Sequence, residues 1–205
     1  MRNIMSRIIH YIIQYLKDYI ADMLPYMIYA IPAILLIRII AVKINQKRKI
    51  RTTIWHEIGF WMFAVFLVGL ASQTIMPLVN DTGDYGEIVL QPGKIFRDSF
   101  NDNGNLAYDY FVLNFLGNIG IFIPVGFFVP LLWRKSGFLK TTLIGFGISL
   151  TIELFQLTLP RVTDIDDLWM NTLGTIIGFL IYVLLDKFLH PFFEKWKVLK
   201  KGEGN

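Results

Sequence analysis

The 205-residue chain contains no cysteine, which excludes a disulfide framework, thiolate catalysis and zinc sites built on thiolates. Charged residues are also scarce, at 18% of the chain, where soluble globular chains carry about 25%. Hydrophobic residues make up 54% and the mean hydropathy is +0.49. This is more apolar surface than one small soluble core can bury. So apolar a chain does not remain disordered in water, and the composition indicates a membrane protein.

Several catalytic motifs are also missing from the sequence. It contains neither H-E-x-x-H nor G-x-S-x-G nor a glycine-rich phosphate loop, so the common zinc-protease and serine-hydrolase signatures are excluded. We expect no cofactor and no metal. The net charge of +4 comes from basic residues beside apolar runs, which indicates membrane lipids rather than nucleic acid as the partner.

Five segments are long and apolar enough to cross a bilayer, since a spanning helix needs about 20 mostly apolar residues. They are residues 19–42, 58–79, 111–133, 138–159 and 168–189. The sequence therefore predicts an all-α, multi-pass integral membrane protein with about five transmembrane helices. The first 18 residues are too short and too polar to span, and their isoleucines recur at helical spacing. We expect them to form an interfacial amphipathic helix.

Basic residues alternate with acidic ones from one connection to the next. The predicted regions are the interfacial segment 1–18, the first two transmembrane helices 19–79, an acidic loop 80–110, a three-helix region 111–189 and a basic tail 190–205. The positive-inside rule places the first and third connections and the tail in the cytoplasm. The N-terminus and the loop 80–110 are then expected outside the plasma membrane, with a short strand or hairpin in residues 83–96.

Three of the predicted spans carry small and polar side chains at helical spacing, on faces that lipid does not favour. The three sets are Asn114, Gly117 and Asn118; Thr142, Gly145, Ser149, Glu153 and Gln156; and Asp167, Asn171, Gly174 and Gly178. We expect these faces to turn toward one another. In the predicted topology their polar residues lie in the outer leaflet, which predicts an outward-facing polar pocket.

Glu153 is the most informative residue of that predicted pocket. An ionised carboxylate at membrane depth costs about 2.5–3.5 kcal/mol even on lenient scales, so Glu153 marks a functional site by default. Arg161 is its expected partner, and a purely structural Glu–Arg pair is the alternative.

The other polar residues have simpler interpretations. Amides such as Asn114 also bridge helices, at about 0.6 kcal/mol per hydrogen bond. The aspartates from Asp164 to Asp167 suit the start of a helix better than a calcium or magnesium site. Arg38 is expected to snorkel to the interface, and the tryptophans fall near the ends of spans, as in aromatic belts.

The ordered motifs NFLGNIGIFIPVGFFVP (114–130), IELFQ (152–156) and PRVTDIDDLWMNTLGTIIG (160–178) resemble those of the VanZ-like family of bacterial membrane proteins. The resemblance covers residues 111–182. The family takes its name from a protein linked to low-level resistance to teicoplanin, and no agreed mechanism comes with it. The family-type polar residues, which we also expect to bind a ligand, are Asn114, Asn118, Glu153, Gln156, Arg161, Asp164, Asp167 and Asn171.

Three functions remain open at this stage. The first is binding of a glycopeptide antibiotic or a lipid-linked cell-wall precursor in the polar pocket, contributing to teicoplanin-type resistance. The second is an intramembrane enzyme acting on a lipid or glycan, with Glu153 and Asp167 as the candidate acid and base. The third is a membrane scaffold whose polar faces serve only helix packing. The sequence does not decide whether the chain is an enzyme.

Overall fold

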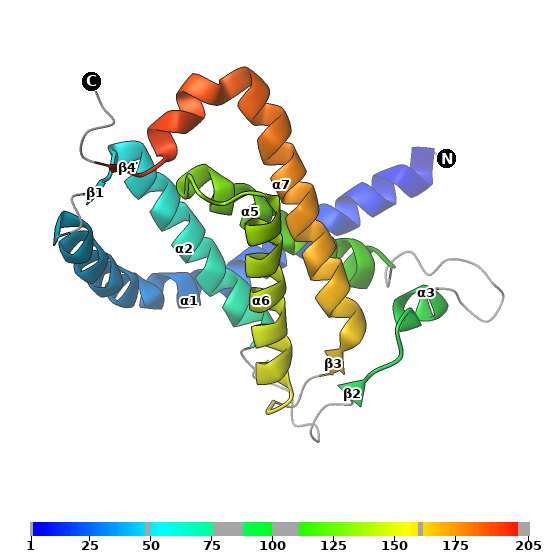
Figure 1. Cartoon of the computed structure of the whole chain (residues 1–205). Helices are drawn as coiled ribbons and strands as arrows, with labels where there is room; N and C mark the ends of the chain where they lie inside the picture. The colour runs from blue at the N-terminus through cyan, green and yellow to red at the C-terminus, as the bar shows by residue number, and fades with distance from the viewer. Residues whose placement is uncertain (1, 48–49, 76–87, 100–110, 160–161, 201–205) are drawn as a thin grey trace.

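The computed structural model describes residues 2–47, 50–75, 88–99, 111–159 and 162–200, and these residues are almost all helical (Figure 1). The helices are α1 (Arg2–Lys47), α2 (Ile54–Thr74), α3 (Lys94–Asp98), the π-helical turn η1 (Phe111–Leu116), α5 (Gly117–Leu132), α6 (Phe138–Gln156), α7 (Ile165–Phe193) and the 3-10 turn η2 (Glu194–Trp196). The described part of the chain contains five helices that are long and apolar enough to cross a membrane. The predicted all-α, multi-pass membrane fold is therefore confirmed.

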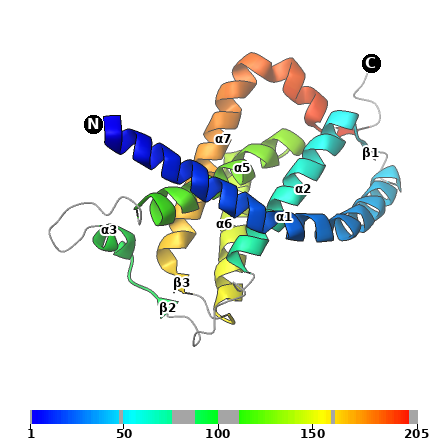
Figure 2. The ribbon, with the colours of Figure 1, turned by 180° about the vertical axis from the view of Figure 1, so that it is seen from behind.

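Helix α1 runs without interruption from the predicted interfacial segment into the first predicted span. Its 46 residues correspond to roughly 69 Å at 1.5 Å per residue, more than twice the thickness of a bilayer core. Pro25 and Pro32 lie inside it, and Figure 2 shows that the helix changes direction along its length. Prolines cause such bends because they remove a backbone hydrogen bond. No helix end separates residues 1–18 from the span, and the interfacial location of that segment stays a prediction.

The closest helix pair is α5 with α7, and glycines make the approach possible. A Cβ atom on Gly174 would overlap the carbonyl oxygen of Ile119, and one on Gly178 would overlap that of Ile123. On the other side, Gly126 meets the carbonyl oxygen of Thr175 in the same way. Small residues at membrane helix contacts let the backbones come together, and van der Waals packing then holds the pair.

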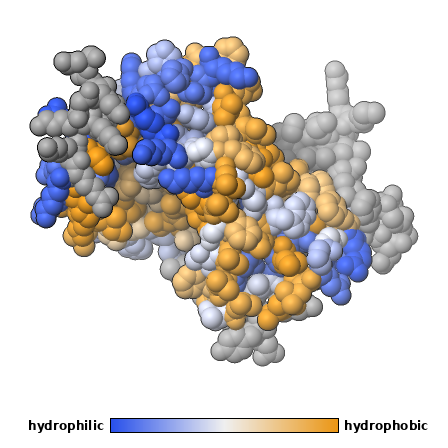
Figure 3. Space-filling view, viewed as in Figure 1, coloured by the Kyte–Doolittle hydropathy of each residue, from blue (hydrophilic) through white to orange (hydrophobic). Residues whose placement is uncertain are grey.

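The remaining spans pack around this pair. Helix α6 carries Gly145 against the side chain of Thr175 on α7. Helix α2 contributes Phe63 and Leu70 to a buried apolar core whose centre is formed by α5. Helix α1 packs on α2, and most of the side chains on its spanning part are exposed. Figure 3 shows hydrophobic surface over much of the visible face, as lipid contact requires.

The end of the chain is folded back onto α2. Helix α7 has a non-helical residue at Leu189, followed by Pro191. After this kink the chain reverses, and β4 (Leu199–Lys200) pairs antiparallel with β1 (Ile50–Arg51). Residues 190–200 of the predicted basic tail are therefore packed against the helices, and the last five residues lie outside the described part.

Candidate functional site

One end of the helix bundle collects the predicted polar residues. Helices α2 and α6 end there, and α5 and α7 begin there (Figure 1). We call the following side chains at this end the polar cluster: Asn118, Ser149, Glu153, Gln156, Asp164, Asp167 and Asn171. They come from α5, α6, β3 (Thr163–Asp164) and α7, so the predicted convergence of three helix faces is present.

Glu153 is buried at the C-terminal end of α6, with 7% of its surface exposed. Among the described residues, its Oε2 accepts one hydrogen bond, from the backbone N–H of Asp164 at 3.3 Å. Gln156, one turn further along, donates from Nε2 to the carbonyl oxygen of Thr74 on α2 at 2.9 Å. Its Oε1 is buried and has no hydrogen-bond partner among the described residues. This part of the cluster therefore holds acceptor groups in excess of donors.

Asp167 faces Glu153 from the first turn of α7. Its Oδ1 accepts a hydrogen bond of 2.5 Å from Nδ2 of Asn118 on α5. The carboxyl groups of Glu153 and Asp167 are close enough to interact electrostatically, and Asp164 adds to the negative potential at both. Like charges at short range repel, and the repulsion is strong where little water screens it. A cation or a set of hydrogen-bond donors would relieve it.

A second polar layer lies one helical turn deeper in the bundle. Nδ2 of Asn171 donates to Oγ of Ser149 at 2.9 Å, and these residues lie four positions from Asp167 and Glu153 on their helices. The hydroxyl of Thr175 donates to the carbonyl oxygen of Asn171 at 3.0 Å. Oδ1 of Asn171 is buried without a hydrogen-bond partner in the described ranges. Buried polar atoms are rarely left unpaired, so this oxygen offers a position for a donor from outside the protein.

Asp164 forms the edge of the cluster, where α7 begins. Its Oδ1 accepts a hydrogen bond from the backbone N–H of Asp166 at 2.9 Å, which makes it the N-cap of the helix. Burial raises the pKa of this carboxyl group above its ordinary value, and the neighbouring Asp166 adds to the rise. The side chain is half-buried and connects the cluster to the surface.

The predicted site residues are not all brought together. Asn118, Glu153, Gln156, Asp164, Asp167 and Asn171 belong to the cluster, whereas Asn114 is exposed. Asn114 lies in the π-helical turn η1, four positions before Asn118 on α5, and its part in the site stays a prediction. Arg161 lies outside the described residues.

Asp166 is a structural carboxylate that our site prediction left out. It is fully buried and accepts hydrogen bonds from the backbone N–H groups of Gly93 and Ile95, at 2.7 and 2.9 Å, and from Trp169 Nε1 at 2.9 Å. Beside it, β2 (Ile88–Val89) pairs in parallel with β3. Residues 88–99 are thereby fixed to the start of α7. Of the strand predicted in residues 83–96, residues 83–87 lie outside the described part, Ile88–Val89 form β2, and the chain then continues into α3.

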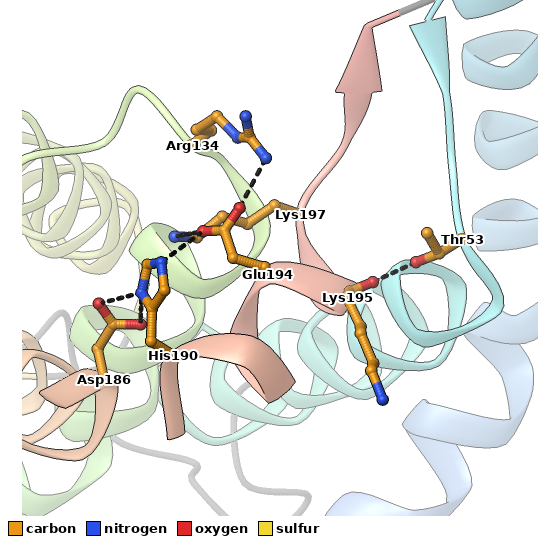
Figure 4. A network of polar contacts seen from close by, with 7 residues as sticks. All are labelled: Thr53, Arg134, Asp186, His190, Glu194, Lys195 and Lys197. Atoms are coloured by element: carbon orange, nitrogen blue, oxygen red, sulfur yellow. Dashed lines mark hydrogen bonds and ion pairs between the residues drawn. The ribbon is translucent and has the colours of Figure 1, made fainter. Parts of the chain in front are cut away.

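The opposite end of the bundle is also polar, but there the charges are paired (Figure 4). The Glu194 carboxylate binds Arg134 Nη2 and Lys197 Nζ, each at 2.7 Å, and His190 lies 3.1 Å from Asp186. Nearby, Nδ1 of the buried His56 lies 2.8 Å from the carbonyl oxygen of Trp196.

Arg38 belongs to the same pattern of paired charges. It is 6% exposed, forms an ion pair with Glu57 through two hydrogen bonds, and lies 4.6 Å from the ring centre of Phe60. The guanidinium is therefore held by a carboxylate in the first turn of α2, and its location at the membrane interface stays a prediction. Its partner is 19 positions away on another helix, beyond the reach of a pattern in one segment.

Helices of membrane-spanning length around a buried acidic and amide cluster define the class: a multi-pass helical membrane protein with buried polar residues at one end of its bundle. A family model described as VanZ/LLP1 matches residues 57–186, which include most of α2, all of α5 and α6, and all residues of the cluster. The chain belongs to this VanZ-like family.

One curated relative supports the assignment. "Protein VanZ" of Enterococcus faecium is 33% identical over 76 residues, which are 37% of this chain and 47% of that protein. The chain thus spans about half the length of this relative in the alignment. No solved structure matches.

The chemistry open to the cluster follows from its atoms. It offers the carboxylates of Glu153 and Asp167, together with the unpaired amide oxygens of Gln156 and Asn171. In the described ranges, no three His, Asp or Glu side chains are grouped so that they could hold a metal ion. These oxygens are hydrogen-bond acceptors, and they suit an organic ligand that donates from amino, amide or hydroxyl groups.

Proposed function

We propose that the protein binds a polar molecule of the cell envelope in the polar cluster and contributes in this way to teicoplanin-type glycopeptide resistance. The ligand is a glycopeptide or a lipid-linked cell-wall precursor, because both carry amide and hydroxyl groups at the outer leaflet. The observation that carries the proposal is the burial of the Glu153 carboxyl group at the end of α6, within electrostatic range of Asp167 and with one hydrogen bond of 3.3 Å from the described residues. A buried carboxyl group in a membrane-spanning helix marks a functional site by default.

The proposal includes a direction in the membrane, with the cluster facing outward, the N-terminus outside and the C-terminus in the cytoplasm. The distribution of charge supports it. The exposed cations Arg51, Arg134, Lys140 and Lys195 gather at the end of the bundle opposite to the cluster, and short basic connections stay in the cytoplasm.

Binding by the purified protein tests the proposal. In nanodiscs, the wild-type chain should bind teicoplanin or a lipid-linked cell-wall precursor, and Glu153→Gln and Asn118→Ala should each weaken binding by about tenfold or more, which corresponds to about 1.4 kcal/mol. Asp186→Asn is the matched control, because it removes a half-buried carboxylate at the other end. Equal affinity in the wild type, Glu153→Gln and Asn118→Ala would refute the proposal.

The electrostatic contact between Glu153 and Asp167 also favours a second candidate, an intramembrane enzyme. Two interacting carboxyl groups in one site can serve as acid and base, since one of them stays protonated more easily than the other. Turnover of a lipid-linked glycan by the wild type and its loss in Glu153→Gln would support catalysis. Turnover no greater than in protein-free discs would refute the enzymatic function, and the proposal of ligand binding would not be affected.

The third candidate, a scaffold, is favoured by the glycine contacts between α5 and α7. It predicts that cluster residues matter for stability alone. Glu153→Gln and Asn118→Ala would then lower the melting temperature in detergent sharply and leave binding and resistance unchanged in the folded fraction.

A further inference from the structure

Four aromatic rings join the segment of residues 88–99 to the helix ends at the cluster side of the bundle. Phe96 of α3 lies 5.5 Å from Phe115 and 6.0 Å from Trp169, measured between ring centres. Phe111 stacks on Phe115 at 4.8 Å. Tryptophan gathers at the headgroup level of membranes, where its apolar ring body and its polar N–H are both accommodated. Trp169 therefore marks this level at the start of α7, and Phe96 packs against it.

The segment also presents apolar side chains to its surroundings. Ile88 is 56% exposed, Leu90 69% and Phe96 48%. Val162, directly before β3, and Ile165, at the start of α7, are exposed as well. Because β2 pairs with β3, these apolar side chains belong to the same end of the bundle as the segment. Exposed apolar side chains beside the end of a membrane-spanning helix are expected to meet lipid.

Charge on the segment fits the same environment. Arg97 is exposed, and Lys94 is half-buried and lies 3.9 Å from Asp98. Short basic and apolar sequences of this kind lie in the headgroup layer, where cations meet phosphate groups and apolar side chains reach the acyl boundary.

The segment is held rigidly enough to present one face. The carboxylate of Asp166 accepts hydrogen bonds from the backbone of Gly93 and Ile95, and the Ile95 side chain is buried against Ile119 and Met170. The parallel pairing of β2 with β3 fixes the start of the segment.

We propose that residues 88–99 form an interfacial element that docks on the phospholipid surface beside the polar cluster, with Leu90 and Phe96 in contact with lipid. The sequence alone indicated a solvated acidic loop here. Docking would place this segment between the polar cluster and the surrounding lipid. The inference does not depend on what the cluster binds.

The absence of native cysteine gives a clean test by single-site labelling. Leu90→Cys, Phe96→Cys and Asp98→Cys are each labelled with an environment-sensitive fluorophore in the full chain, in nanodiscs of phosphatidylcholine and phosphatidylglycerol. Residue 98 is the matched control, since it lies about 200° around the helix from residue 96 at 100° per residue. Leu90 makes no ring contact, so its variant keeps the test valid if replacing Phe96 disturbs the aromatic group.

The expected result is blue-shifted emission at 90 and 96, quenched by nitroxide lipids more strongly than by aqueous iodide, with the reverse order at 98. Asp166→Asn in the Leu90→Cys background should shift the emission back toward the aqueous value. Emission and iodide quenching that are equal at all three sites would overturn the proposal. Protection from iodide without quenching by nitroxide lipid would also overturn it, because protein, such as a second copy of the chain, would then cover the surface.

Discussion

The two ends of the helix bundle use charge in opposite ways. At the end formed by β1, η2 and the kinked part of α7, buried or half-buried charges have charged partners, as in Arg38 with Glu57 and Glu194 with Lys197. At the other end, Glu153 and Asp167 face each other with one hydrogen bond apiece from the described residues. The contact between α5 and α7 supports both ends of the bundle. The polar residues at the first end therefore support the fold, whereas those at the second end are the ones that we propose to bind a ligand.

The largest effect is expected from a substitution that disrupts the contact between α5 and α7. Gly174→Leu places a side chain against the backbone of Ile119, and we expect a loss of at least about 3 kcal/mol of stability, or failure to fold, because neither backbone can retreat. Unfolding in mixed micelles measures it. Gly147→Leu is the control, since a Cβ there meets nothing within 4 Å. Equal losses in the two variants would show that the glycine contact does not support the bundle.

At the paired end, Arg38→Met should cost about 3 kcal/mol, because it leaves the Glu57 carboxylate without its partner in a partly buried position. Adding Glu57→Gln should restore most of the loss, since both charges are then gone. The same micelle unfolding experiment compares the two variants. A single variant as stable as the wild type would mean that this end is not held by its ion pair.

Two neutral replacements at the cluster end compare the contribution to stability of a structural carboxylate, Asp166, with that of a proposed ligand-binding one, Glu153. Asp166→Asn should cost about 2 kcal/mol, because the amide keeps the oxygen that accepts from Gly93 and Trp169 and loses the acceptor of Ile95 N–H, and a bond to a charged group contributes about 1.5–3 kcal/mol. Glu153→Gln should change stability by less than about 1 kcal/mol, since the amide keeps an acceptor for the one hydrogen bond that the described residues donate and removes a buried ionisable group. Thermal melts of both variants make the comparison. The reverse order would favour the scaffold.

The smallest expected effect concerns Asp164 and pH. Burial raises the pKa of this carboxyl group in the folded protein, so the folded state holds its proton more tightly than the unfolded state does. The stability from this group is present below the ordinary pKa of aspartate and is lost as the pH rises through the raised value. Asp164→Asn keeps an N-cap side chain and removes the titration. The melting temperature of the wild type relative to the variant should fall with rising pH, and a rise would contradict the assignment.

Local patterns in the sequence predicted most of the fold. The apolar runs gave α2, α5, α6 and α7 to within a few residues, and the spacing of small and polar residues placed Glu153, Asn171 and Gly174 on inward faces, because both signals repeat with the helical period. The continuity of α1 was not predicted, since a polar segment followed by an apolar one also fits two helices.

The contacts between distant segments could not be predicted in this way. The Asp166 carboxylate meets backbone N–H groups 71 and 73 positions away, and backbone donors leave no trace in side-chain spacing. The π-helical form of η1, which contains Asn114, was not predicted either, since the sequence FVLNFL carries no signal for it. Arg38 was assigned to the interface from its place near a span end, and its pairing with Glu57 follows only from the packing of α1 on α2.

The most direct test of the central claim is the sidedness of the two bundle ends in living cells. Asp164→Cys at the edge of the cluster and Lys195→Cys at the opposite end can each be probed as the one cysteine of the chain with a maleimide that does not cross membranes. If the cluster faces outward, we expect residue 164 to react in intact cells and residue 195 to react only after permeabilisation. Labelling of residue 195 in intact cells, with residue 164 protected until the membrane is opened, would place the cluster on the cytoplasmic side and contradict the proposed encounter with envelope ligands.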